Sequence, residues 1–370
     1  MSEKKRKGTP LWQISKKFNF AAEKIIPDSF VFCVVLTLVV AVLSLTVCHI
    51  GPVELLTSWW DGLSSQFTLA FQMGLMVVVC ATCARSPQVS KLLDGLSGLV
   101  HTRVAALILL MAFGYVSSML NWAFCTIVTP ILAMQLAKRV KGLHFPMMVA
   151  GGYCCMILGQ CLGPSATLYS NLATEGSNYA EIVGKTMTVA ETCYNPVNVV
   201  LWVILAVCFI VLVLFTQPGD DELVELRSIA TQADVAPKDY QSREKATTPA
   251  EKMNTCKPIM WVVGAAIFIY IIYSIATKGF FATLNMNMVI FMFVGINCFL
   301  FPQPHSWMEA HTDSMHLATD VILQFPFYGA IMGMMYVEGG LGSVIVNAIV
   351  SVATAQTMPI FSFLSACIVN

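Results

Sequence analysis

The sequence is short of charged residues. Asp, Glu, Lys and Arg together make up 11% of its 370 residues, whereas hydrophobic residues make up 57%. A soluble domain carries about 25% charged residues, so this supply is too small to cover a surface that faces water. The formal net charge is zero, which gives nucleic acid no basic surface to bind. The composition is therefore that of an integral membrane protein that does not bind nucleic acid.

Three further absences narrow the function. The N-terminus lacks the short apolar core and the small-residue cleavage site of a signal peptide. There is no nucleotide-binding motif, which argues against transport driven by ATP. No Arg or Lys falls within a predicted membrane span. A dicarboxylate would therefore lack strong positive partners, whereas helix termini and hydroxyl groups can hold a small monocarboxylate.

The cysteines and histidines predict neither a metal site nor a bound cofactor. Most of the 13 cysteines lie inside apolar runs, where a free cysteine behaves as a small buried hydrophobic residue. Cys80 and Cys83 have the spacing of a metal or redox pair, but no His, Asp or second pair accompanies them. His305, His311 and His316 are expected to form a solvated face.

Hydropathy divides the chain into five regions. They are a basic amphipathic N-terminus at 1–28, a first membrane repeat at 29–216, a loop at 217–257, a linking span at 258–277 and a second repeat at 278–370. We place the spans at 29–50, 63–84, 145–163, 196–216, 258–277, 284–301 and 320–337. The positive-inside rule puts the N-terminus and the basic segment 85–103 in the cytoplasm. The loop 217–257 is polar and is expected to be cytoplasmic and partly disordered.

The apolar segment 104–137 does not fit a simple span. Basic residues flank both of its ends, so both ends should be cytoplasmic. Residues 104–124 are enough to cross the membrane, but residues 125–137 are too few to return. We interpret the segment as a re-entrant hairpin whose tip, near Asn121, reaches the bilayer midplane. Irregular backbone at that depth persists only where protein or a water-filled cavity satisfies its polar groups.

Parts of the chain repeat at a nearly constant offset. Ser58-Trp59 and Ser306-Trp307 are 248 residues apart, and Asn121 and Asn370 are 249 residues apart in similar surroundings. The extra span at 258–277 carries the chain across the membrane, so the second repeat should be inverted relative to the first. An inverted repeat of this kind is typical of secondary transporters.

The hairpin tip supplies the first candidates for a substrate or ion site, namely Ser117, Ser118, Asn121 and Trp122. A hairpin tip exposes helix ends and unpaired backbone groups, which suit a carboxylate or a cation. The alternative is that these polar residues hold helices together. By symmetry, Asn370 would occupy the second tip.

Other polar residues are secondary candidates. Gly163, Ser165 and Thr167 interrupt a helix and would line the same cavity, or they simply cap a loop. Gln72 and Gln324 recur in both repeats, and packing between repeats is the alternative role. Glu191 and Glu338 could carry a coupling proton, but their positions near water favour solvated carboxylates.

Several motifs are specific enough to suggest a family. They are Pro27-Asp28, Ser58-Trp59-Trp60-Asp61-Gly62, Phe71-Gln72-Met73, Asn121-Trp122, Glu191-Thr192, Gln324-Phe325-Pro326-Phe327-Tyr328 and Glu338-Gly339-Gly340-Leu341-Gly342. With these residues the chain resembles the short-chain fatty acid transporter family, the kind found with acetoacetate-degradation genes, over nearly its whole length. That family belongs to the ion-transporter superfamily.

The resemblance implies an all-α polytopic membrane protein with inverted repeats, two re-entrant hairpins and homodimeric assembly in the bacterial inner membrane. It implies secondary transport of small monocarboxylates such as butyrate or acetoacetate, with Na⁺ or H⁺ as the coupling ion and no cofactor. Transport of another small organic anion remains an alternative, and a membrane-embedded enzyme is a weaker one, since no membrane Cys or Ser has a His nearby in sequence.

The chain departs from the family pattern in two places. Gln160-Cys161-Leu162 stands where the family is rich in glycine, although Gly163, Ser165 and Thr167 still fit its Gly-x-Ser-x-Ser pattern. The family also continues beyond the position of Asn370 with a second glycine-rich run and further spans. On this comparison the second repeat is expected to be incomplete, so a non-functional fragment is a further alternative.

The predicted topology can be tested with Cys256, which lies in the loop 217–257. If this loop is cytoplasmic, a membrane-impermeant thiol reagent should leave Cys256 unlabelled in intact cells and label it after permeabilisation. Ready labelling of Cys256 in intact cells would show that the topology is wrong.

Overall fold

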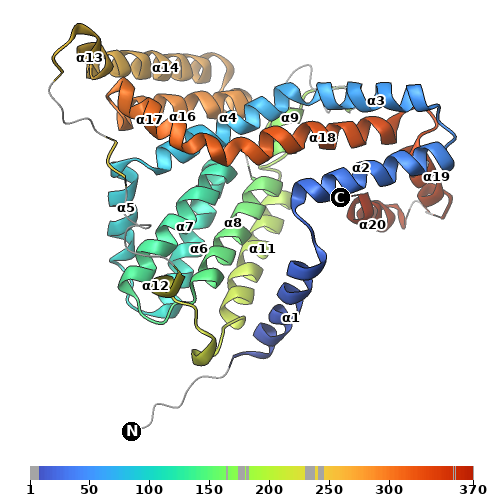
Figure 1. Ribbon diagram of the computed structural model, residues 1–370, viewed down its shortest axis with the longest axis horizontal. Coiled ribbons are helices and arrows are strands. Elements are labelled where there is room, and N and C mark those ends of the chain that lie inside the picture. Colours follow the sequence, from blue (N-terminus) through green and yellow to red (C-terminus); the bar gives the residue numbers. More distant parts are fainter. Residues whose placement is uncertain are drawn as a thin grey trace. The chain divides into compact units, whose positions relative to one another are not determined.

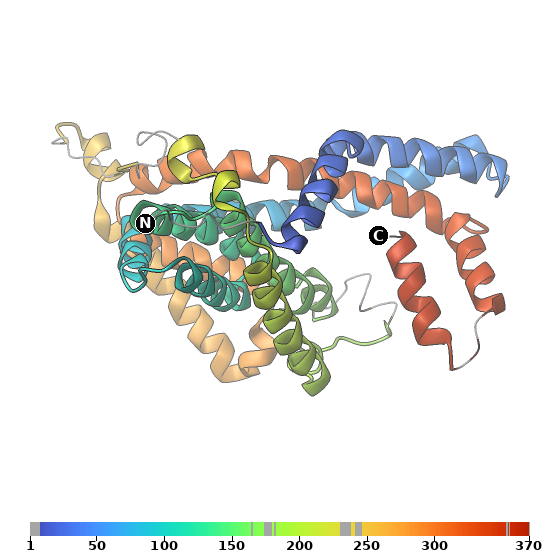
Figure 2. The ribbon, with the colours of Figure 1, turned by 90° about the horizontal axis from the view of Figure 1, so that it is seen from below.

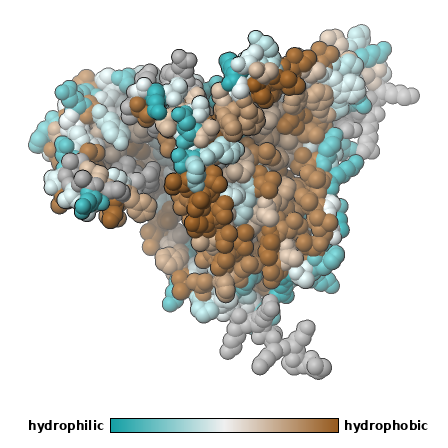
Figure 3. Space-filling model, turned by 180° about the vertical axis from the view of Figure 1, so that it is seen from behind, coloured by the Kyte–Doolittle hydropathy of each residue, from teal (hydrophilic) through white to brown (hydrophobic). Residues whose placement is uncertain are grey.

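A computed structural model describes residues 8–163, 166–173, 180, 183–229, 238–240, 246–352, 354 and 356–369, and these form helices and connecting turns without strands. Seven helical segments are long and apolar enough to cross a membrane: Ser29–Thr46, Pro52–Ala84, Arg103–Leu120, Phe145–Leu162, Pro196–Phe215, Pro249–Lys278 and Pro304–Tyr336. Apolar side chains also cover much of the face seen in Figure 3. The chain is therefore an all-α, multi-pass membrane protein, as predicted.

The helices of the first half are α1 (Pro10–Ile25), α2 (Ser29–Thr46), α3 (Pro52–Ser65), α4 (Phe67–Ala84), α5 (Pro87–Ser97), α6 (Arg103–Leu120), α7 (Trp122–Arg139), α8 (Phe145–Leu162), α9 (Thr167–Leu172) and α11 (Pro196–Phe215). Those that follow are η1 (Asp220–Glu222), α12 (Leu226–Ile229), α13 (Pro249–Asn254), α14 (Lys257–Lys278), α15 (Phe280–Thr283), α16 (Met286–Leu300), α17 (Pro304–Met315), η2 (His316–Ala318), α18 (Thr319–Tyr336), α19 (Leu341–Val352) and α20 (Met358–Val369).

The predicted spans match these helices to within four residues. The segment before the second span had no predicted helix, yet it forms α3, which begins with Pro52 at its first turn and has Glu54 near its N-terminus. Proline and an acidic residue both favour a helix start. The helix α16 has 15 residues, or about 22 Å at 1.5 Å per residue, which is shorter than the hydrocarbon layer.

The order of helices in the first repeat recurs in the second. The helices α2 to α6 and α16 to α20 both run in the order of apolar helix, short helix, long helix, short helix and apolar helix. In each set the second and third helices together span 33 residues, Pro52–Ala84 and Pro304–Tyr336. Both begin with a proline at the first helical turn. The helix order therefore agrees with the repeat that the sequence offsets suggest.

The chain folds into two compact units. Unit 1 contains residues 1–20 and 75–318, and unit 2 contains residues 21–74 and 319–370. The core of unit 1 is a bundle in which α6, α7 and α8 pack against one another, with α5 against α7 and α11 against α8 (Figure 1). Glycines permit the close packing: a Cβ atom at Gly152 would lie 2.6 Å from Thr129 Oγ1, and one at Gly114 would lie 2.8 Å from Cys155 Sγ.

Within unit 1, the start of α1 is tied to the segment that follows α11. Glu222 accepts hydrogen bonds from Trp12 Nε1 and Lys16 Nζ, and the hydrogen bond from Lys16 is the main reason that the pKa of this carboxyl is lowered. Arg103 forms an ion pair with Asp220 at 3.2 Å. The predicted basic amphipathic helix is thus present and anchored. The disorder expected in the loop 217–257 would fall largely on residues 230–237 and 241–245, which lie outside the described residues.

In unit 2, α18 packs against both α2 and α3. Gly329 and Gly333 lie four residues apart on α18 and face Gly62 on α3; a Cβ atom at Gly333 would lie 2.9 Å from the Cα atom of Gly62. A Gly-x-x-x-Gly pair lets two helix backbones approach closely in a membrane. The helices α19 and α20 run side by side in roughly opposite directions (Figure 2).

This close packing predicts that Gly333→Ala destabilises the protein. The added methyl group would meet the α3 backbone, which cannot move aside as a flexible side chain can, and overpacking of this kind costs about 1–3 kcal/mol. The expected result is a lower apparent melting temperature in detergent. Gly95→Ala on α5 is the control, because no atom lies within 4 Å of that Cβ position. Equal melting temperatures for the two variants would contradict the packing argument.

Candidate functional site

The segment predicted as a re-entrant hairpin forms two helices joined at one residue. The helices α6 and α7 each have 18 residues, and Asn121 alone separates them. The returning arm is longer than the expected 125–137 because it starts at Trp122 and continues to Arg139. At 1.5 Å per residue each arm is about 27 Å long, close to the thickness of the hydrocarbon layer. A tip at the midplane would need shorter or strongly tilted arms.

Asn121 caps both helices of the hairpin. Its backbone N–H donates to the carbonyl of Ser117 at 3.0 Å, which ends α6. Its side-chain Oδ1 accepts from the N–H groups of Ala123 at 2.8 Å and Phe124 at 3.2 Å, which starts α7. The residue is fully buried. One residue thus satisfies backbone groups of both helices that could not find water inside a membrane.

The helix α4 forms the wall opposite the tip. Asn121 Nδ2 lies 3.0 Å from the sulfur of Met76, and Cys80 Sγ lies 3.6 Å from Asn121 Oδ1. A second buried asparagine, Asn297 on α16, donates from Nδ2 to the carbonyl of Val79 at 2.8 Å. Asn121 and Asn297 therefore contact the same stretch of α4.

Asn297 also carries a polar atom that needs a partner. Its Oδ1 is buried and accepts no hydrogen bond from any residue that the structure describes. A buried amide oxygen without a partner costs about 1–3 kcal/mol, so a water molecule, an ion or a substrate group is expected beside it. The ring contact between Phe124 and Phe293, with centroids 5.4 Å apart, packs α16 against the first turn of α7.

The other predicted tip residues are buried, and the hydroxyl groups of the two serines form hydrogen bonds within the hairpin. Ser117 Oγ donates to Gly114 O at 3.0 Å, and Ser118 Oγ donates to Tyr115 O at 2.9 Å. These hydroxyl oxygens keep acceptor capacity, but their protons are already used. Trp122 is buried and begins α7. The structure thus brings Ser117, Ser118, Asn121 and Trp122 together, with the hydroxyls of the two serines bonded within α6.

The break after α8 is present where it was predicted. Gly163 caps α8, with its N–H donating to Gly159 O at 3.1 Å. Gly159 itself lies against the tip, since a Cβ atom there would be 2.6 Å from the Cβ of Ser118. Thr167 begins α9. Ser165 lies outside the described residues, and so does the side chain of Thr167.

The remaining candidates fall elsewhere. Gln72 and Gln324 belong to unit 2. Gln324 Nε2 donates to Ser29 Oγ at 2.9 Å, and its Oε1 accepts from Tyr328 at 3.1 Å, so its amide is used in helix packing. Asn370, the proposed counterpart of Asn121, lies outside the described residues.

The titratable candidates are solvated, with one exception. Glu191 and Glu338 are exposed, and Glu191 accepts hydrogen bonds from Thr188, which lower its pKa. His305 and His316 are exposed as predicted, but the prediction was wrong for His311, which is half-buried on α17 with its Nδ1 3.5 Å from Thr82 Oγ1. Within the described ranges no three His, Cys, Asp or Glu side chains could hold a metal ion.

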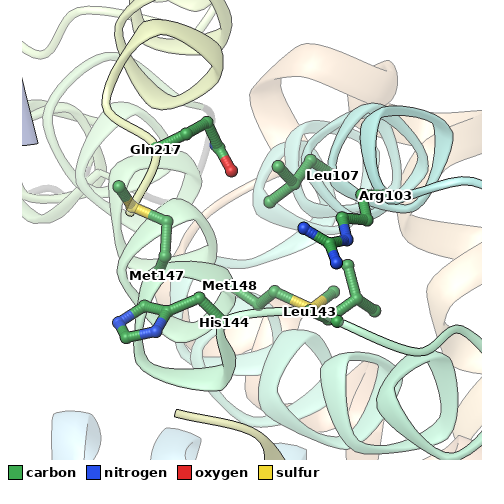
Figure 4. A pocket seen from close by; sticks show the side chains of 8 residues that line it. Arg103, Leu107, Leu143, His144, Met147, Met148 and Gln217 are labelled. Carbon is green, nitrogen blue, oxygen red and sulfur yellow. The ribbon is translucent and has the colours of Figure 1, made fainter. Parts of the chain in front are cut away.

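A small cavity lies at the base of the hairpin, lined in part by Arg103, His144 and Gln217 (Figure 4). Its volume of about 10 Å³ suffices for roughly one water molecule. His144 Nδ1 accepts from Val224 N–H at 3.0 Å, and burial lowers the pKa of this histidine. Arg103 is already paired with Asp220. This cavity is therefore part of the hairpin support and too small for a substrate.

The arrangement at the tip suits ion binding better than covalent catalysis. Cys80 contacts Asn121, and Cys125 Sγ donates to Gly114 O, so neither thiol is paired with a histidine base. Thr82 lies near His311, but its hydroxyl donates to Val78 O at 2.8 Å. By contrast, the carboxyl end of α6 and the amino end of α7 meet at Asn121, and such ends carry about half a charge of opposite sign.

Sequence reasoning missed the α4 wall and Asn297. The signal for Asn297 was a lone amide in an apolar span, which suggests an interior position. Nothing in the sequence pointed to its partner, the carbonyl of Val79, which lies 218 residues away.

The chain is similar to known proteins over nearly its whole length. A family model described as "Short chain fatty acid transporter" matches residues 11–370. A protein of Escherichia coli named "Putative short-chain fatty acid transporter" is 27% identical over 360 residues, covering 97% of this chain and 80% of the relative. A Haemophilus influenzae protein of the same name is 26% identical over 367 residues, with the same coverage. No solved structure matches the chain.

The double cap predicts that Asn121→Ala lowers stability more than Asn121→Ser does. Alanine removes the oxygen that accepts from the α7 backbone, and loss of such a cap costs about 0.5–2 kcal/mol, whereas serine can keep it. The measurement is the apparent melting temperature of each variant in the same detergent. If both variants melt together at the wild-type temperature, the cap does not stabilise the hairpin.

Proposed function

The chain belongs to the short-chain fatty acid transporter family, and on that premise we propose that it is a secondary transporter of small monocarboxylates. Its substrates would be compounds such as butyrate or acetoacetate, carried across the cytoplasmic membrane. The proposal includes two inverted repeats with re-entrant hairpins, which the recurring helix order supports. A transporter of another small organic anion is the alternative within the same class.

The hairpin tip is the observation that carries this proposal. At Asn121 the positive end of α7 and the negative end of α6 lie one residue apart. The first suits a carboxylate and the second suits a cation, each with a helix-end interaction of up to about 2 kcal/mol when partly buried. One small site could therefore hold an organic anion together with a coupling cation, as the broken helices of other transporters do.

The buried polar groups favour Na⁺ over H⁺ as the coupling ion. Across the part of the chain that the structure describes, the buried polar residues are serines, threonines, two asparagines and His144, and none is Asp, Glu, Lys or Arg. Proton coupling inside a membrane usually relies on a titratable residue there. Sodium instead needs oxygen ligands, and the carbonyl oxygens at the end of α6 and Oδ1 of Asn297 provide that chemistry.

Uptake of labelled butyrate into vesicles tests the proposal. We expect Asn121→Ala to reduce saturable uptake at least tenfold, and Asn121→Ser to reduce it similarly, because serine keeps the cap but lacks the amide group. Asn254→Ala is the matched control, since Asn254 is exposed at the end of α13, and its uptake should equal that of the wild type. Expression and membrane insertion of every variant are measured alongside.

The ion is tested in the same vesicles by imposing a Na⁺ gradient or a pH gradient separately. A sodium-coupled protein should accumulate butyrate with the first and not with the second. Wild-type uptake by Asn121→Ser would return Asn121 to a purely structural role. Accumulation driven only by the pH gradient would overturn the sodium assignment.

A further inference from the structure

A cavity lies in unit 1 where α14 ends and α16 begins. Its volume is about 360 Å³, which falls in the range of small-molecule sites and is far more than one water molecule needs. The lining residues that matter here are Tyr270, Ser274, Lys278, Asn285, Asn287 and Phe291. This cavity is separate from the hairpin tip, because neither the tip residues nor α4 line it.

One end of the cavity is positively charged and polar. Lys278 is the last residue of α14 and forms no ion pair with any residue that the structure describes. Asn285 caps α16, where its Oδ1 accepts from Met288 N–H at 3.0 Å, so the positive end of that helix also faces this region. Lys278 is the single charged side chain among the lining residues, which gives the cavity a preference for an anion.

Ser274 adds a hydroxyl group to the polar part of the cavity wall. The residue lines the cavity and is only 4% exposed. Its hydroxyl is not among the buried polar atoms that lack a hydrogen-bond partner in the described part of the chain. A serine hydroxyl can donate one hydrogen bond to an anion that enters the cavity.

The other end of the cavity is apolar. The rings of Tyr270 and Phe291 are in edge contact, with centroids 5.8 Å apart. Tyr270 is 51% exposed, and the neighbouring Ile269 is 68% exposed. The main packing partners of α14 are α16, α15 and α17. The apolar end therefore continues onto the exposed apolar side of α14.

The position of α14 sets the depth of the cavity in the membrane. Its 22 residues are about 33 Å long, which matches the hydrocarbon thickness, so Lys278 lies at the level of the lipid head groups. Three exposed aromatic residues lie close to Lys278 in the sequence, namely Tyr273, Phe280 and Phe281. Aromatic residues of this kind are enriched at membrane interfaces.

A simpler role for Lys278 is to extend into water and balance the negative end of α14. That role explains the lysine. It does not explain a cavity of this size beside the lysine.

We propose that this cavity binds the phosphate head group of an anionic phospholipid. Lys278, Ser274 and the amide of Asn285 would face the phosphate, and an acyl chain would lie along Tyr270 and the exposed side of α14. A free carboxylate could use the same polar groups, but it would leave the apolar end of the cavity and the adjoining lipid-facing surface unfilled. A zwitterionic lipid would bring a second positive charge close to Lys278.

Native mass spectrometry of the full chain tests this site, with phosphatidylglycerol and phosphatidylcholine of identical acyl chains. We expect the wild type to retain phosphatidylglycerol preferentially. Lys278→Gln should reduce its retention about fivefold, the effect of one basic residue near an anionic head group, whereas Lys278→Arg should preserve it. Ser274→Ala should also weaken retention. Lys257→Gln, at the other end of α14, is the control and should have no effect.

Three outcomes would overturn the proposal. Equal retention of the two lipids by the wild type would show that the cavity does not select an anionic head group. An equal loss in Lys257→Gln and Lys278→Gln would show a general effect of charge. Displacement of bound phosphatidylglycerol by butyrate would show that the cavity is a site for free carboxylates.

Discussion

The structure depends on one constraint: backbone groups inside a membrane must find partners without water. At the hairpin tip Asn121 meets this constraint with its backbone N–H for α6 and its Oδ1 for α7. No loop is needed, and the chain reverses direction at a single residue between two 18-residue helices. The same capping leaves the two oppositely charged helix ends adjacent, and this is where we propose a site for small ions.

The tip is held in place by small residues and amides rather than by charges. Gly159 lets α8 approach Ser118, and Gly152 lets it approach Thr129. On the other side, Asn121 and Asn297 contact one stretch of α4 through Met76 and Val79. The ion pairs that the structure describes for these helices lie at or near helix ends, namely Arg103 with Asp220 and Arg139 with Asp94. Packing around a few uncharged polar groups avoids the cost of burying a charge, and it is consistent with the ion site that we propose.

The spans and the hairpin tip could be predicted from the sequence because hydropathy and flanking charge are local signals. Asn121 stood out as an amide within an apolar run. The packing of α3 could not be predicted, because it depends on Gly62 lying against Gly329 and Gly333 of a distant helix. The packing role of Gln324 depends on Ser29, 295 residues away. Contacts between residues so far apart in the sequence produce no periodic pattern of residue types. They can therefore be identified only from the three-dimensional structure.

The contact between α3 and α18 also has a consequence for how the protein is made. Gly62 leaves the ribosome roughly 270 residues before Gly333. At synthesis rates of about 5–20 residues per second, the first helices of unit 2 wait roughly 15–55 seconds for the partner against which they pack. During that interval the glycine face of α3 is open to lipid or to the insertion machinery. Early membrane insertion and late assembly are thus separate events, and a defect at this contact would yield an inserted but unassembled chain, a target for membrane quality control.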